Sequence, residues 1–273
     1  MIHIDDTCYY HVTTLLRPSG LVYPDGSHDD LLDLIRLGAV QAFCQRYCTP
    51  TRSLQLLFMP GLSTRPLLAA GLIGPPLFIV VFLIEGATRP GYSAWRNYVS
   101  QLATGEGGWV QVVNFIVCGT LMVGFAIGLR LALRRGRGSV AAPVLLGAFG
   151  MALLVAGVFA TDPALGYPPG APTVHTTHGL VHGLAGLAAF SLLAAACFVM
   201  AWSFAGDAAS RGWAIYSAST GLVIVACFVA SSVFSVLDAQ GAMPNAPTGF
   251  VQRISIIGGW GWITMVAARL LQR

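Results

Sequence analysis

The chain has 273 residues, of which 55% are hydrophobic and only 10% are charged, and its mean hydropathy is +0.71. An ordinary soluble domain carries about 25% charged residues, so this composition excludes a soluble globular protein. The net charge of +4 comes from arginines that are scattered or lie at the ends of apolar segments, which argues against a nucleic-acid-binding function.

Residues 1–58 differ in composition from the rest and hold six of the eleven acidic residues, all by Asp33. The segment LLDLIRLGAVQAF (31–43) favours a short amphipathic helix, which is too short to span a bilayer. We expect 1–58 to be either a poorly ordered cytoplasmic extension or the product of a wrongly assigned start, because MPGLSTRPLLAAG at Met59 resembles the beginning of a membrane protein. Mass spectrometry of the native N-terminus would separate the two.

Residues 59–273 contain six apolar segments that are each long enough to cross a bilayer, since a spanning helix needs about 20 mostly apolar residues. They run from about residue 66 to 87, 110 to 133, 141 to 161, the histidines at 175–182 to 204, 213 to 237, and 254 to 271. The pattern predicts an all-α, polytopic membrane protein built as a bundle of six transmembrane helices.

Arginine placement predicts the orientation of this bundle. The connection between the second and third segments carries Arg130, Arg134, Arg135 and Arg137, and the C-terminal tail carries Arg273. Basic residues favour the cytoplasmic side, so we expect a multi-pass protein of the cell (cytoplasmic) membrane with both termini in the cytoplasm. The first, third and fifth connections then face outward.

Polar residues gather at the predicted outer face. They comprise the loop RPGYSAWRNYVSQLATGEGGW after the first segment, and Glu85, Asp162, the three histidines, Asp238, Gln252 and Arg253. Scattered polar residues would not collect at one end of all six segments, so this convergence indicates a site. Within the loop, SAWRNYVSQL is consistent with a short interfacial helix that presents Arg96 and Ser100 on one face.

The run HTTHGLVHG places His175, His178 and His182 at i, i+3 and i+7, on one face of a helix. Two histidines at i, i+4 can hold one zinc ion, and Asp162 or Glu85 could complete the ligand set. A zinc-bound water with a lowered pKa would then be available for hydrolysis.

Two other interpretations of the histidines stay open. One is a proton-titrating histidine without metal. The other is a structural polar network, in which Asp162 hydrogen-bonds a histidine across helices and Gly179 and Gly183 form a GxxxG packing motif.

Four segments carry a resemblance to a known family: RPGYSAWRNYVSQL, ATDP, HGLVHG and GFVQRI. They resemble the family catalogued as domain of unknown function 998, which comprises bacterial and archaeal integral membrane proteins with about six spans, and the resemblance covers roughly residues 65–271. Arg89 stands where a histidine is common in the family, and Gln101 where an acidic residue is common. The positions that match are Tyr92, Ser93, Asn97, Ser100, Asp162, His178, His182 and Arg253.

The first functional hypothesis is an outward-facing site that binds or hydrolyses a lipid or envelope molecule, with zinc as an optional cofactor. Its catalytic candidates are Asp162, His178, His182 and Ser100; its metal candidates are His175, His178, His182 and Asp162; its substrate-binding candidates are Tyr92, Arg96, Asn97 and Arg253. The alternatives are a small proton-coupled transporter and a non-catalytic membrane partner or assembly protein, alone or as an oligomer. The sequence does not decide whether the protein is an enzyme.

Overall fold

The computed structural model describes residues 63–133 and 135–272, so the predictions made for residues 1–58 lie outside the described ranges. The described residues form six long helices, each long and apolar enough to span a membrane, and no strand. This confirms the predicted all-α bundle of six spans. The helices are α4 (Thr64–Thr88), α5 (Trp109–Ala132), α6 (Ala141–Val158), α7 (Thr177–Phe204), α8 (Arg211–Ala239) and α9 (Thr248–Leu271).

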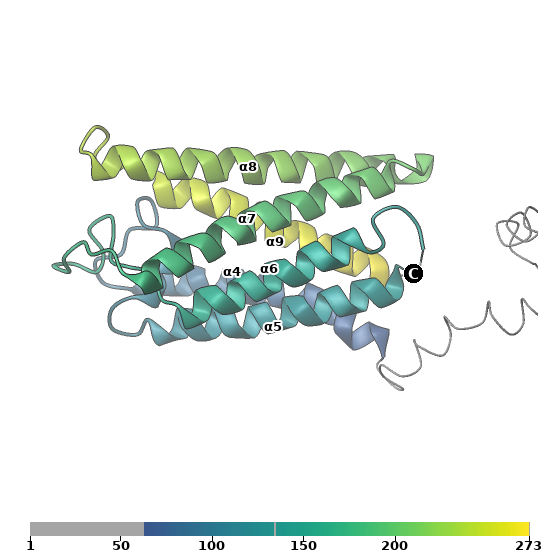
Figure 1. Cartoon of the computed structure of the whole chain (residues 1–273), viewed down its shortest axis with the longest axis horizontal. Coiled ribbons are helices and arrows are strands. Elements are labelled where there is room, and N and C mark those ends of the chain that lie inside the picture. The colour runs from purple at the N-terminus through teal and green to yellow at the C-terminus, as the bar shows by residue number, and fades with distance from the viewer. Residues whose placement is uncertain (1–62, 134, 273) are drawn as a thin grey trace, which may run out of the picture. The chain divides into compact units, whose positions relative to one another are not determined.

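Each helix packs against the next one in the chain, and α9 packs against α4 (Figure 1). The connections α4–α5, α6–α7 and α8–α9 lie at one end of the bundle, which we call the loop end. The connections α5–α6 and α7–α8 lie at the opposite end, and the latter contains the short 3₁₀ helix η2 (Ala208–Ser210). The fold therefore brings the polar segments that converge in the sequence to one end.

Small residues and aromatic rings form the contacts between helices. Gly119 of α5 and Gly150 of α6 approach so closely that a Cβ on either would lie 2.9 Å from the carbonyl oxygen of the other. In the interior, the Trp260 ring stacks on Phe78 with ring centroids 4.3 Å apart and meets Phe149 edge-on. Such packing stabilises membrane bundles because lipid removes most of the hydrophobic drive between helices.

The loop after α4 differs from its prediction. A 3₁₀ helix, η1, covers only Val99–Ala103, and residues 94–97 form a turn, so the predicted interfacial helix over SAWRNYVSQL is wrong. Asn97 explains the difference, because its side chain accepts a hydrogen bond from the Ser93 amide at 2.9 Å and donates one to the Leu165 carbonyl at 3.0 Å. Local side-chain bonds of this kind compete with a regular helix.

Candidate functional site

His182 lies in the second turn of α7 and is buried. Its Nδ1 is 3.0 Å from the carbonyl oxygen of Ala156 and 2.8 Å from that of Phe159. Carbonyls only accept, so Nδ1 carries a proton, and in the neutral ring Nε2 is left as an acceptor. His182 thus closes the C-terminal end of α6, where helical carbonyls lack partners within the helix. α6 ends at Val158, three residues before the predicted end.

The other two histidines are in different surroundings. His175 precedes α7, and both His175 and His178 are exposed, with the His178 ring against Phe159 at a centroid distance of 5.3 Å. Among residues 63–133 and 135–272, no three His, Cys, Asp or Glu residues are grouped so that they could hold a metal ion. The structure therefore does not bring the four predicted metal ligands together as a ligand set.

Asp162 binds the start of α7 rather than a histidine. Its carboxylate accepts hydrogen bonds from the Thr176 amide at 2.8 Å and the Thr176 hydroxyl at 2.6 Å, and Thr176 in turn caps α7 by accepting from the Gly179 amide. A Cβ on Gly179 would lie 2.0 Å from the carboxylate, whereas one on Gly183 would meet nothing within 4 Å. The proposed GxxxG helix contact is therefore wrong: Gly179 makes room for a carboxylate and Gly183 faces open space.

Acid should weaken this arrangement. Hydrogen bonds from the Thr176 hydroxyl and then its amide lower the pKa of Asp162, and His175 and His178 nearby add to this effect. Since the pKa is lowered in the folded state, the stabilisation is complete above the ordinary aspartate pKa of about 3.9 and is lost as the pH falls through the lower folded value. We expect Asp162→Asn to melt roughly 2–4 °C below the wild type at pH 7, and the gap to shrink below about pH 4. Thermal melts from pH 7 to pH 3.5 test this; a gap that stays constant with pH would contradict it.

Arg253 of α9 is buried and holds the first loop in place. Its Nη1 donates to the carbonyls of Ala94, Asn97 and Gly249 at 2.7, 3.1 and 2.9 Å, and its Nη2 donates to the Tyr92 hydroxyl. Burial raises the pKa of Tyr92, so its hydroxyl stays protonated at neutral pH. Gly249 is needed for this close approach, because a Cβ there would lie 2.1 Å from the Asn97 carbonyl oxygen. These predicted substrate-binding residues are thus engaged with one another.

Arg96 pairs with Asp238, the last acidic residue of α8. Arg96 Nε and Nη2 lie 2.7 and 2.8 Å from the two carboxylate oxygens. This bidentate bond raises the pKa of Arg96 further. The pair joins the first loop to α8. The Arg96 guanidinium, which was predicted to bind a substrate head group, is thus bound to Asp238.

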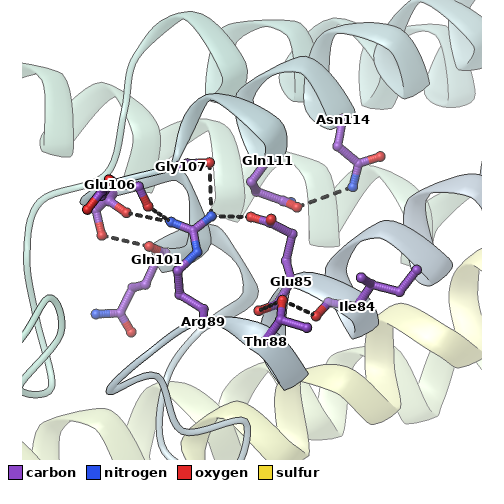
Figure 2. Close-up of polar contacts among 10 residues, drawn as sticks. Ile84, Glu85, Thr88, Arg89, Gln101, Glu106, Gly107, Gln111 and Asn114 are labelled. Atoms are coloured by element: carbon purple, nitrogen blue, oxygen red, sulfur yellow. Dashed lines mark hydrogen bonds and ion pairs between the residues drawn. The ribbon is translucent and has the colours of Figure 1, made fainter.

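Glu85, the alternative metal ligand, is also paired. Figure 2 shows the Arg89 guanidinium between the Glu85 carboxylate and the backbone carbonyls of Glu106 and Gly107, the latter at 2.9 Å. Arg89 thereby ties the end of α4 to the residues that lead into α5. These contacts give Glu85 and Arg89 a structural role.

Beneath the loop end, the helices of the bundle line a partly open cavity of about 270 Å³. Its lining comes from η1 and from all six long helices. Its deeper wall is largely aromatic, with rings from Phe78, Phe115, Phe149, Phe190, Phe228 and Trp260.

The part of the cavity nearest the loop end is polar. It is lined by Tyr98, Ser100, Thr161, His182 and Gln252. The Gln252 Oε1 accepts from the Val99 amide at 2.8 Å, and burial raises the pKa of Tyr98, which keeps that hydroxyl protonated. Two of the predicted catalytic residues, Ser100 and His182, therefore line one cavity, whereas Asp162 and His178 do not line it.

One side of the cavity is bordered by α7 and α8. The two helices lie close near the connection between them and separate toward the loop end (Figure 1). On α7, a Cβ at Gly183 or Gly186 would meet nothing within 4 Å, and Leu187 is about half exposed. Phe190 and Phe228 stack at a centroid distance of 4.8 Å below this opening. Gly183 and Gly186 therefore leave space on this side of the cavity, toward the surface that spans the membrane.

Sequence reasoning missed most of this cavity. Gln252 and Tyr98 were noted as interfacial residues, and Gly183 was assigned to helix packing. The sequence signal for the cavity was the pair Gly183 and Gly186, which lie one turn apart and next to His182. Glycines that face no helix leave space beside a polar residue.

The comparisons with known proteins give a family and no activity. Residues 72–269 match the family model described as protein of unknown function (DUF998). No curated protein and no solved structure matches the chain.

Proposed function

The chain belongs to the DUF998 family, whose description assigns no activity, and we propose from its geometry that it binds an amphiphilic, lipid-like molecule in the cavity beneath the loop end. The observation that carries the proposal is the polarity of this cavity: hydrogen-bonding side chains near the loop end and aromatic rings deeper in the bundle. Ligand sites are mostly apolar with a few placed polar groups, and this cavity has that composition.

His182 is the residue proposed to recognise the polar end of the ligand. Its Nδ1 is committed to the carbonyls of α6, which fixes the ring and its tautomer. Within the described ranges its Nε2 makes no hydrogen bond, so it can accept one from a ligand hydroxyl. Ser100 lines the same cavity and is proposed as a second contact.

Hydrolysis of the bound lipid is a second candidate function, favoured by the same fixed imidazole. A neutral ring whose Nδ1 is held by acceptors is oriented to take a proton at Nε2, as a general base does. Ser100, whose hydroxyl would give up that proton, lines the same cavity. This proposal needs no metal.

The placement of the arginines favours one orientation of the bundle across the membrane. We propose that the loop end faces outward from the cell membrane and that both termini are cytoplasmic, because Arg130 lies in the last turn of α5 and Arg135 and Arg137 lie in the α5–α6 connection. Reaction of single cysteines placed at Gly170 and Gly212 with a membrane-impermeant thiol reagent on whole cells would test it.

A leucine at Gly186 is expected to abolish ligand binding without weakening the fold. A Cβ there has free space, and the longer side chain would enter the cavity. Glycine costs a helix roughly 0.5–1 kcal/mol relative to alanine, so its removal favours α7. Lipids extracted from the purified protein and quantified by mass spectrometry should fall at least about tenfold per mole of protein.

Gly258→Leu is the matched control, because a Cβ at Gly258 also meets nothing within 4 Å but Gly258 does not line the cavity. It should retain the lipid content of the wild type. Equal lipid content in the Gly186→Leu and Gly258→Leu variants, at equal melting temperature, would rule out the cavity as the binding site.

A further inference from the structure

We propose that the ligand of this cavity is a single-chain lipid with an uncharged, hydroxyl-bearing head group, such as a monoacylglycerol or a long-chain alcohol. This inference rests on the proposed function and names the class of molecule that the cavity selects.

The lining of the cavity argues against a charged head group. None of the residues that line it is Asp, Glu, Lys or Arg. An ion placed inside a membrane protein without a partner is costly, so phosphate, carboxylate and ammonium groups would be disfavoured.

The nearby charged residues do not supply a partner. Arg253, beside Gln252 in the chain, directs its Nη1 and Nη2 at three carbonyls and the Tyr92 hydroxyl. Arg96 and Asp238 neutralise each other in a bidentate pair. Arg253 keeps its positive charge, because its partners are uncharged, but it does not line the cavity, so the groups at the polar end of the cavity offer dipoles and no charge.

These dipoles fit a hydroxyl group. In the neutral His182 ring, Nε2 can only accept a hydrogen bond. The side-chain Oε1 of Gln252 already accepts from the backbone amide of Val99, so the side-chain nitrogen of Gln252 is left to donate. A hydroxyl can donate to the first and accept from the second at once. The hydroxyls of Ser100 and Thr161, which can do either, suit a head group with more than one oxygen.

The size and the opening fit one chain. An engineered cavity of about 150 Å³ holds a benzene molecule, so about 270 Å³ holds a small head group and the first part of one chain. The remainder can leave between α7 and α8, past Gly183 and Gly186, into the surrounding lipid. The 18-residue apolar window of the span that contains α8 is 22% buried, the smallest share among the six spans, which is consistent with lipid on this side.

The test compares three probes that share an 18-carbon monounsaturated chain on the full-length protein: monooleoylglycerol, oleoyl lysophosphatidic acid and oleylamine. Binding is titrated by native mass spectrometry in detergent, with Gly186→Leu as the blocked control. We expect monooleoylglycerol to bind one per chain and at least about tenfold more tightly than either charged probe. The binding should be lost in Gly186→Leu.

His182→Asn sharpens the comparison. The asparagine amide nitrogen can replace Nδ1 as the donor to the α6 carbonyls, while nothing replaces the acceptor Nε2. We expect a melting temperature near that of the wild type and weaker monooleoylglycerol binding by about tenfold, whereas removal of both nitrogens in His182→Leu should also lower the melting temperature.

The outcomes separate the two proposals. Gly186-dependent binding of a charged probe, as tight as that of monooleoylglycerol, would overturn the uncharged head group and leave the lipid site standing. Absence of Gly186-dependent binding of all three probes, together with no extracted lipid from the wild type, would overturn both.

Discussion

Replacing Arg253 by methionine is expected to lower the free energy of unfolding by about 3 kcal/mol, since each buried acceptor left without its donor costs about 1–3 kcal/mol. The guanidinium donates hydrogen bonds to the carbonyls of Ala94 and Asn97 and to the Tyr92 hydroxyl, which all belong to the loop after α4. Methionine fills similar space but has no hydrogen-bond donor for these acceptors. For a domain of this size the melting temperature should fall by roughly 6–12 °C.

Differential scanning fluorimetry of the purified protein measures this effect. Arg253→Lys is the matched variant, because it keeps the charge but cannot reach the carbonyls and Tyr92 together from one planar group. Its melting temperature should lie between those of the wild type and Arg253→Met. A methionine variant that melts within about 2 °C of the wild type would show that the loop does not depend on Arg253.

The fold could be predicted from the sequence because a bilayer leaves few choices. In lipid every backbone amide and carbonyl must find a partner within the segment, so an apolar run of sufficient length is a helix. The ends of helices were less predictable, as α6 shows. Near Val158, where α6 ends, the carbonyls of Ala156 and Phe159 accept from His182, a contact between residues 23–26 positions apart.

The convergence of polar residues at one end was predictable, but their partners were not. Topology alone brings Arg96, Asp162 and Arg253 to the loop end. Which carboxylate meets Arg96 depends on how α8 lies relative to the first loop, and Asp238 is 142 positions away. The partners of the predicted metal ligands were equally unpredictable. Asp162 accepts hydrogen bonds from Thr176, and the three histidines lie in different surroundings.

The cavity was the least predictable feature, because it depends on where helices fail to touch. A glycine one turn from another glycine favours a helix contact as readily as a gap. At Gly183 and Gly186 the structure has the gap. Only the three-dimensional arrangement of α7, α8 and α9 joins this space to Gln252 and Ser100.

The pair Arg96–Asp238 should respond unequally to the loss of either partner. The Asp238 side chain is 1% exposed, whereas that of Arg96 is 31% exposed. Arg96→Met leaves a buried carboxylate without a counter-charge, which costs about 3–5 kcal/mol when a buried pair is broken in this way. Asp238→Asn leaves a guanidinium that can turn toward water, so its cost should be about 1 kcal/mol, as for an exposed pair.

The double variant Arg96→Met/Asp238→Asn decides between this explanation and a simple loss of contact. The double variant removes the buried charge together with its partner, so it should recover most of the stability lost in Arg96→Met. The stability losses of the two single variants should therefore not add up to that of the double variant. Thermal melts of the four proteins at pH 7 measure the coupling. If Asp238→Asn melts as low as Arg96→Met, or if the double variant melts lower still, the stability of this end would come from the hydrogen bonds between loop and α8, and the burial of the carboxylate would contribute little.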